Sequence, residues 1–99
     1  MMERRAFVFK LEPGMKAEYI RRHREIWPEM RAMLKDAGIR NYSIWYCGGR
    51  LFGYYESDDL NATDAFKAAS PIQQNWNRYM EGLIVREPGE APEQVFLLE

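Results

Sequence analysis

The chain has 99 residues, of which 46% are hydrophobic, 29% are charged and 14% are aromatic, and its formal net charge is −1. This balance excludes a disordered chain, and the length suits a single domain over residues 1–99 with one modest core. The slight negative charge argues against nucleic acid, whose phosphates need a basic footprint, and favours a small neutral ligand. No apolar stretch approaches the length of a membrane span, so we expect no membrane partner.

The only cysteine, Cys47, cannot form an internal disulfide. Because disulfides are typical of oxidising compartments, the lone thiol indicates a reducing one, and we expect a cytoplasmic protein. Cys47 also belongs to no group with the spacing of metal ligands. The sequence contains no glycine-rich phosphate loop and no serine or cysteine nucleophile motif. We therefore expect neither a metal nor a cofactor.

The first part of the chain predicts a strand followed by a helical segment. Residues 4–11 alternate like a half-buried strand, in which every second side chain from Phe7 onward shares one face. Residues 15–37 then carry apolar side chains at helical spacing, and Gly38 supplies a stop. Pro28 interrupts this pattern because it has no backbone N–H to donate, so we expect either a kink or two helices that meet there.

The rest of the chain predicts a hairpin, two helices separated at a proline, a loop and a last strand. Gly48-Gly49 can adopt the positive φ angles of the hairpin turn, and Ser70-Pro71 separates the two helices. The predicted ranges are strands at 42–47 and 51–56, helices from about 58 to 69 and from 71 to about 80, a loop at 86–93 and a strand at 94–99.

The order of strand, helix, strand, strand, helix and strand is the ferredoxin-like βαββαβ pattern. It predicts an α+β fold with an antiparallel sheet and helices on one face of it. The many aromatic side chains in the strands make water a poor cover for the other face. We therefore expect two sheets to pack face to face in a homodimer of the dimeric α/β-barrel type.

His23 is the only histidine, and its ordinary pKa near neutrality suits proton transfer. Tyr19 and Trp27 lie four residues before and after it, so a continuous helix would place all three on one face. Aromatic faces suit the apolar C–H patches of a sugar, while phenol and imidazole groups reach its hydroxyls. The alternative is that Tyr19 and Trp27 only pack against the sheet, and for Trp27 packing is the favoured interpretation.

Tyr42 and Trp76 are two further aromatic candidates, again with packing as the alternative. Both are far from His23 in sequence, so spacing alone leaves open whether they meet it. From the residues alone, the prediction is a small dimeric domain with an aromatic pocket. Such a pocket carries out proton transfer without a cofactor, or it binds a ligand without catalysis.

Four stretches resemble the L-rhamnose mutarotase family: RRAFVFKLEPGMKAEYIRRHREIWPEM at 4–30, NYSIW at 41–45, NWNRYM at 75–80 and QVFLLE at 94–99. The resemblance covers nearly the whole chain, and Y-x-x-x-H-x-x-I-W-P-E within the first stretch is its most specific part. It implies a dimeric ferredoxin-like fold and a monosaccharide ligand. It further implies His23 as the proton donor and sugar contacts from Tyr19, Tyr42 and Trp76.

Two departures from the family pattern concern the pocket. Members usually carry a second tryptophan directly after the first, where this chain has Asn77. An amide there removes apolar area and adds hydrogen-bonding capacity, which shifts the preference of this substrate-binding position away from a 6-deoxy sugar. The loop at 86–93, REPGEAPE, is shorter than the family's usual Asn-Pro-Asp-Asn-Ser-Pro run, which alters closure of the pocket if that run helps to close it.

The resemblance implies mutarotation, in which a pyranose opens to an aldehyde and closes again as the other anomer. We expect His23 to protonate the ring oxygen while Tyr19, Tyr42, a carboxylate such as Glu29, or water takes the anomeric proton. Two alternatives belong to other classes. One is a cofactor-free or haem-dependent monooxygenase of the same architecture, and the other is a sugar-binding protein without catalysis.

Overall fold

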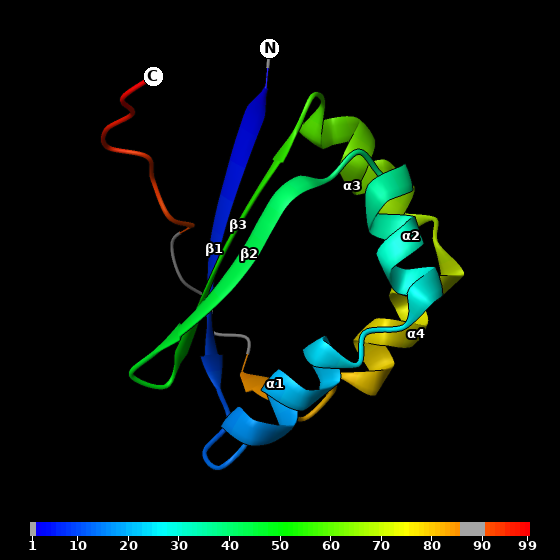
Figure 1. The fold of residues 1–99 in the computed structure, drawn as a ribbon, viewed down its shortest axis with the longest axis vertical. Helices are drawn as coiled ribbons and strands as arrows, with labels where there is room; N and C mark the ends of the chain where they lie inside the picture. Colours follow the sequence, from blue (N-terminus) through cyan, green and yellow to red (C-terminus); the bar gives the residue numbers. More distant parts are fainter. Residues whose placement is uncertain (1, 86–90) are drawn as a thin grey trace.

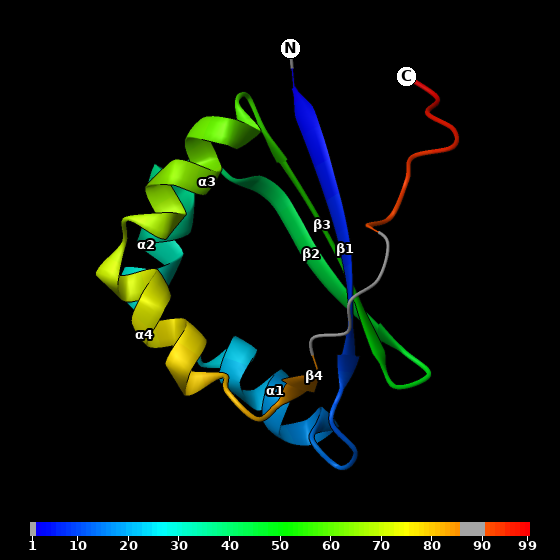
Figure 2. The same cartoon turned by 180° about the vertical axis from the view of Figure 1, so that it is seen from behind.

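The computed structural model describes residues 2–85 and 91–99. In this part of the chain, four strands form one sheet in the order β2-β3-β1-β4, and all neighbouring strands are antiparallel. Figures 1 and 2 show the sheet curving as one wall, with the helices as the opposite wall. The elements are β1 (Glu3–Leu11), α1 (Lys16–Arg24), α2 (Pro28–Asp36), β2 (Arg40–Cys47), β3 (Arg50–Ser57), α3 (Leu60–Ala68), α4 (Pro71–Tyr79) and β4 (Ile84–Val85).

The strand order and the gathering of the helices on one face confirm the predicted ferredoxin-like α+β fold. The predicted hairpin is present, and Gly48 and Gly49 make its turn with φ angles of 58° and 82°. The break at Ser70-Pro71 is also present between α3 and α4. No helix among the described residues combines the length and the apolar character needed to cross a membrane.

The helical segment that contains Pro28 is two helices rather than one kinked helix. α1 ends at Arg24, and Trp27 precedes α2 in an extended backbone conformation, with φ −61° and ψ 137°. Pro28 fits the first position of α2 because the N–H that it lacks would have no partner there. Tyr19 and His23 therefore share a helix, whereas Trp27 lies outside it.

The middle of the sheet depends on one glycine. In the β1–β3 ladder Phe7 pairs with Gly53. A Cβ atom at Gly53 would lie 1.9 Å from Cζ of the Phe7 ring, so the ring occupies the space that any other side chain would need. Phe7 thereby lies flat across the inner face of the sheet, where it forms part of the floor between the sheet and the helices.

The two ends of the fold are held by different interactions. Where α1, α2 and α4 meet the sheet, the interior is apolar. At the other end, the hydroxyls of Ser57 and Thr63 lie 2.7 Å apart, and Thr63 donates to the carbonyl of Ala37 at 2.6 Å. This buried polar network ties β3, α3 and the end of α2 together. The apolar cluster consists of Leu11, Tyr19, Met30, Met33, Ala37, Leu51, Trp76, Met80 and Leu83.

The predicted strand at 94–99 is wrong for this chain as described. Residues 91–99 contain no strand and extend away from the sheet, on the side opposite the helices (Figures 1 and 2). A strand needs a neighbour for its backbone hydrogen bonds. Among the described residues, the edge of β1 that faces away from β3 pairs with the two-residue strand β4 alone, which the sequence did not indicate. The predicted loop at 86–93 falls partly on residues 86–90, which lie outside the described residues.

Candidate active site

A cavity of about 1200 Å³ lies between the inner face of the sheet and the helices. All five residues that the sequence singled out for catalysis or sugar contact line this cavity, and they come from α1, β2 and α4: His23, Tyr19, Tyr42, Trp76 and Asn77. Spacing in the sequence had left open whether Tyr42 and Trp76 meet His23. The fold brings the three to one space.

The His23 ring is held by aromatic contacts and by one hydrogen bond. It stacks on Tyr19 with ring centroids 4.4 Å apart, and it meets the edge of Trp76 at 5.5 Å. Its Nδ1 lies 3.2 Å from the carbonyl oxygen of Tyr19. Because a carbonyl oxygen can only accept, Nδ1 carries the proton, and in the neutral ring Nε2 is left as a proton acceptor.

Burial sets the charge of His23. It lowers the pKa of His23 from its ordinary value of 6.5, and the backbone hydrogen bond to Tyr19, which acts in the opposite direction, is the weaker influence. At neutral pH the ring is therefore predominantly neutral. A neutral imidazole with Nδ1–H engaged is suited to take up a proton at Nε2 before it gives one away.

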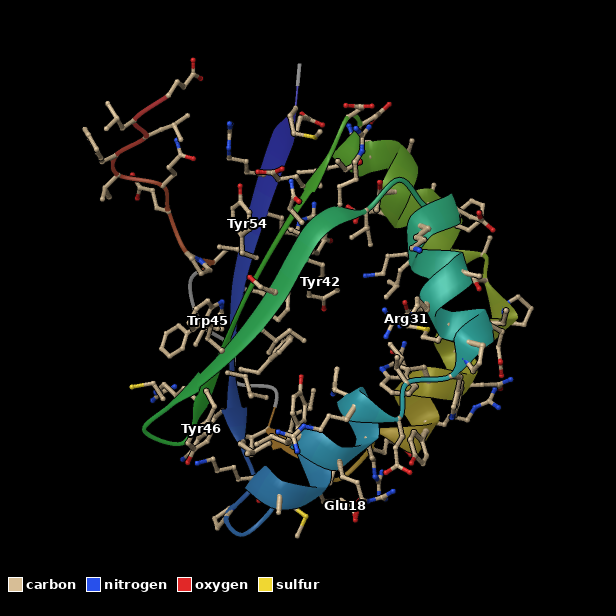
Figure 3. The ribbon with its side chains drawn as sticks, in the orientation of Figure 1. Glu18, Arg31, Tyr42, Trp45, Tyr46 and Tyr54 are labelled. Carbon is tan, nitrogen blue, oxygen red and sulfur yellow. The ribbon has the colours of Figure 1, made fainter. Side chains whose placement is uncertain are left out.

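The two tyrosines of the site are hydrogen-bond donors at neutral pH. Burial raises the pKa of Tyr19 to about 12. It also raises the pKa of Tyr42, and the nearby Tyr19 and Tyr55 hydroxyls raise it further. Figure 3 shows Tyr42 pointing from β2 into the space between sheet and helices. Neither phenol readily gives up its proton near neutrality, which removes both as candidates for the base.

The carboxylate considered as a base, Glu29, does not line this cavity. It is exposed in the first turn of α2 and borders a separate pocket between α2, α3 and the start of α4. Of the groups that the sequence offered as the base, water remains, and so do two other carboxylates that line the cavity, Asp64, which is paired with Arg5, and Glu81. The unprotonated Nε2 of His23 is a further candidate, which the sequence analysis had not considered as a base.

Trp27 packs against other aromatic side chains, as the sequence analysis favoured. Its ring meets the edge of Trp76 at 5.1 Å and lies 5.2 Å from Tyr79. Trp27 is not one of the residues that line the cavity. It supports the site from behind, because it fixes the orientation in which Trp76 presents its ring to His23.

Asn77 is part of an amide pair that the sequence did not reveal. Its side-chain oxygen accepts a hydrogen bond from the amide nitrogen of Gln73 at 2.8 Å. Both residues line the cavity. Gln73 Oε1 is buried and has no hydrogen-bond partner among the described residues. The amide pair makes this wall polar, at the position where the family resemblance predicted a second tryptophan.

Charged residues at the cavity wall were also missed. Arg5, Arg31 and Lys67 line the cavity from β1, α2 and α3. Arg5 could have been found, because it falls on the same alternation as Phe7. Lys67 and Arg31 carry no such signal, since a lysine or arginine on a helix normally belongs to a solvated face. No group of three or more histidine, cysteine, aspartate or glutamate side chains in the described ranges is arranged to hold a metal ion.

The fold and the cavity define a ferredoxin-like α+β protein with an aromatic cavity built around a neutral histidine. The model of the L-rhamnose mutarotase family matches residues 4–98. L-rhamnose mutarotases from Listeria monocytogenes and Enterococcus faecalis are 41% and 40% identical to this chain, over 99% and 92% of it and over 95% and 89% of their own lengths. The chain belongs to the L-rhamnose mutarotase family, a family of isomerases.

Solved structures agree with this assignment. The crystal structure of an L-rhamnose mutarotase from Formosa agariphila superposes with a TM-score of 0.83 at 31% identity, covering 98% of this chain and 99% of that one. A NIPSNAP-like domain protein from Burkholderia xenovorans superposes with a TM-score of 0.65 at 18% identity, over 99% of this chain and 90% of that one. The second likeness extends to the fold alone.

Proposed function

We propose that this protein interconverts the α and β anomers of L-rhamnose or of a closely related aldose. The observation that carries the proposal is the meeting of His23, Tyr19, Tyr42 and Trp76 in one cavity, in a chain that belongs to the L-rhamnose mutarotase family. The sugar identity is supported by the relatives, which are themselves L-rhamnose mutarotases.

In the proposed reaction, Nε2 of His23 takes the proton of the anomeric hydroxyl. A C1–O1 double bond forms as the C1–O5 bond breaks, and the electron pair of that bond stays on O5. The imidazolium then gives the proton to O5, which leaves an open-chain aldehyde and a neutral histidine. Rotation about C1–C2 followed by the reverse steps closes the ring as the other anomer.

This sequence of steps refines the role that the family resemblance implies. His23 is still the proton donor to the ring oxygen, but it donates only after it has accepted, because burial keeps the resting ring neutral. Tyr19 and Tyr42 donate hydrogen bonds to sugar oxygens, and Trp76 offers an apolar ring to the C–H face of the sugar. Mutarotation also proceeds unaided in water. A positioned acid–base group contributing roughly 10²–10⁴-fold is therefore sufficient.

The test is selective-inversion NMR on L-rhamnose at anomeric equilibrium, with and without the protein. Inverting the resonance of one anomer and following its transfer to the other gives the exchange rate directly. We expect exchange that becomes faster in proportion to protein concentration. Exchange at the background rate for L-rhamnose and for L-fucose, L-lyxose and D-mannose would overturn the proposal.

We also propose that the protein is a homodimer in which the outer face of the sheet is covered by a second copy. Trp45, Phe52 and Val8 pair across β2, β3 and β1, and 69%, 41% and 37% of their respective surfaces are exposed. In Figure 3 Trp45 and Tyr54 point away from the helices. Three adjacent strands that expose apolar side chains suit burial against a partner.

The segment 91–99 supplies a matching apolar surface. Val95, Phe96 and Leu98 are 90%, 76% and 83% exposed, and the segment lies on the same side as the outer face of the sheet (Figure 2). In the proposed dimer this segment packs on the partner. Sedimentation should give twice the 11.8 kDa of the chain, and the double variant F96E/L98E should sediment as one chain. A monomeric parent protein would contradict the proposal. Residues 1–99 as one domain and a cytoplasmic location stay predictions from the sequence.

A further inference from the structure

The wall of the cavity is positively charged, although the whole chain has a formal net charge of −1. Five cationic side chains line the cavity against two anionic ones. A cleft lined mainly by one sign of charge attracts ligands of the other sign. The cationic residues are Arg5, Arg31, Lys35, Arg40 and Lys67, and the anionic ones are Asp64 and Glu81. Arg40 is paired with Asp58, outside the lining, so four cations set the charge of the wall.

Two of these cations meet at Tyr55. Lys67 reaches from α3 to the sheet, where its Nζ lies 5.6 Å from the centroid of the Tyr55 ring. Arg5 on β1 donates to the Tyr55 hydroxyl at 3.0 Å. Arg5 is also paired with Asp64, through a hydrogen bond of 3.0 Å from Nη2 to Oδ2 and a second, shorter one. One carboxylate therefore faces two cations, and the cluster keeps a positive charge.

Lys67 has only a shared counter-charge, because the nearby carboxylate of Asp64 is already hydrogen-bonded to Arg5. Its side chain is half-buried, and its ammonium group makes no hydrogen bond or ion pair with any of the described residues. Desolvation lowers the pKa of Lys67; the charge of Asp64 opposes this shift, and the weaker influence of Arg5 adds to it. An ammonium group that has lost part of its water is unfavourable unless another partner replaces the water. An anion in the cavity is such a partner.

The cluster and the histidine are two ends of one wall. Tyr42 connects the two ends. The hydroxyl of Tyr19, on which His23 stacks, raises the pKa of Tyr42, and the ring centroid of Tyr42 lies 5.2 Å from that of Tyr55. A sugar along this wall with its anomeric carbon at His23 extends towards Lys67. The cavity, at about 1200 Å³, also exceeds the several hundred Å³ that enclose a ligand of ordinary size.

We propose that Lys67 and Arg5 form an anion subsite, and that the preferred substrate is an aldose with an acidic group at the end remote from its anomeric carbon. A uronate carboxylate and a terminal phosphate both have this chemistry. The inference rests on the proposed mutarotase function, whose sugar class it specifies. Arg31 adds positive charge from the helical wall and points into the same space as Tyr42 (Figure 3). Asn77 also favours a substrate with a polar group at this end, because it offers an amide where a 6-methyl group would need an apolar surface.

The experiment measures anomer exchange by NMR for acidic sugars, each against its own neutral parent. The pairs are D-galacturonate with D-galactose, L-guluronate with L-gulose, and D-mannose 6-phosphate with D-mannose. We expect at least one acidic sugar to have a kcat/KM roughly tenfold or more above that of its neutral parent. A tenfold ratio corresponds to the free energy that one hydrogen bond to a charged group contributes. The uronate and phosphate pairs show which acidic group the subsite takes.

Substitutions at Lys67 separate this subsite from the general charge of the protein. K67M should lower the ratio of acidic to neutral kcat/KM by roughly tenfold, and K67R should restore most of it. K16M is the matched control, because Lys16 lies over the Tyr46 ring and does not line the cavity. It should leave the ratio as it is. An equal fall of the ratio in K16M and K67M would overturn the subsite.

Binding without catalysis distinguishes failure of the inference from failure of the proposed function. Methyl α-D-galactopyranosiduronate and methyl α-D-galactopyranoside cannot open their rings, and calorimetry gives their affinities. Tighter binding of the acidic glycoside that depends on Lys67 supports the subsite even if no sugar exchanges faster. Accelerated exchange of L-rhamnose with no preference for acidic sugars would overturn the subsite and leave the mutarotase proposal intact. Inorganic phosphate that binds as tightly as the acidic sugars would overturn the assignment of the anion to the substrate.

Discussion

The two ends of the cavity differ in how they treat charge. Around His23 the surroundings are aromatic, and burial favours the neutral imidazole. Around Tyr55, two cations share the one carboxylate of Asp64, so the cluster keeps a positive charge. The difference indicates that proton transfer and substrate binding are assigned to different ends of the same cavity. The neutral end can exchange protons near physiological pH, while the charged end can hold a substrate by its far side without disturbing the histidine.

The largest effect is expected from removing the proton carrier at the neutral end. H23Q keeps a polar side chain but cannot shuttle a proton, so the catalysed part of L-rhamnose exchange should fall by roughly 10²–10⁴-fold. The measurement is the NMR exchange rate at equal protein concentration. R24Q is a matched control, because Arg24 is the exposed neighbour of His23 on the same helix. Catalysis that survives in H23Q would show that the chemistry belongs to another group.

The pH dependence follows from the lowered pKa of His23. In the proposed mechanism catalysis begins with proton uptake at Nε2, so the active form is the neutral ring, which predominates above the ordinary value of 6.5. kcat/KM should be level above that pH and should fall at lower pH, approaching about tenfold per unit once the pH is below the pKa of His23. A catalysed rate that rises as the pH falls would mean that the imidazolium acts first as an acid.

A smaller effect is expected between the two ends, at Tyr42. Y42F removes the hydroxyl and keeps the ring contacts with Phe7 and Tyr55, so only a hydrogen bond to the sugar is lost. We expect kcat/KM to fall by roughly two- to tenfold. Y46F on the same strand is the control, since Tyr46 does not line the cavity. Kinetics of Y42F equal to those of the parent protein would assign Tyr42 to packing.

The smallest expected effect concerns the polar wall at Asn77. N77W introduces the apolar ring that the family resemblance predicts at this position, which should favour a 6-methyl group over a 6-hydroxyl group. The ratio of kcat/KM for L-rhamnose over L-mannose should rise by roughly threefold to tenfold. N75W places the same ring on α4 at a residue that does not line the cavity. An unchanged ratio in N77W would show that this position does not choose the sugar.

The parts of the fold that could be predicted from the sequence are those with a local physical cause. Pro28 lacks a backbone N–H, and two adjacent glycines permit the hairpin turn, so both features are present where expected. The strand prediction at 94–99 failed because an apolar run does not say whether a neighbouring strand exists within the same chain. The short strand β4 depends on its contact with β1 and has no signal of its own.

In the candidate site, too, some features could be predicted from the sequence and others depend on the fold. Each aromatic residue was visible singly, and the family resemblance tied Tyr42 and Trp76 to His23, but their meeting in one cavity depends on how β2 and α4 fold onto α1. The break after α1 also separates Trp27 from the helix of His23. The helical spacing of apolar residues continues across the break, so it could not show whether Trp27 shares that helix. Lys67 was invisible, because a lysine on a helix becomes unusual only when the fold turns it toward a cavity.

The most direct test of the account is the protonation state of His23 itself. Long-range ¹H–¹⁵N correlation spectra of the ¹⁵N-labelled protein at pH 7.5 separate the two ring nitrogens, and this chain has only one histidine to assign. We predict a neutral ring with the proton on Nδ1 and an unprotonated Nε2 whose resonance moves when L-rhamnose or a preferred acidic sugar is added. An imidazolium at this pH, a proton on Nε2, or an Nε2 resonance unmoved by a saturating sugar would contradict the account.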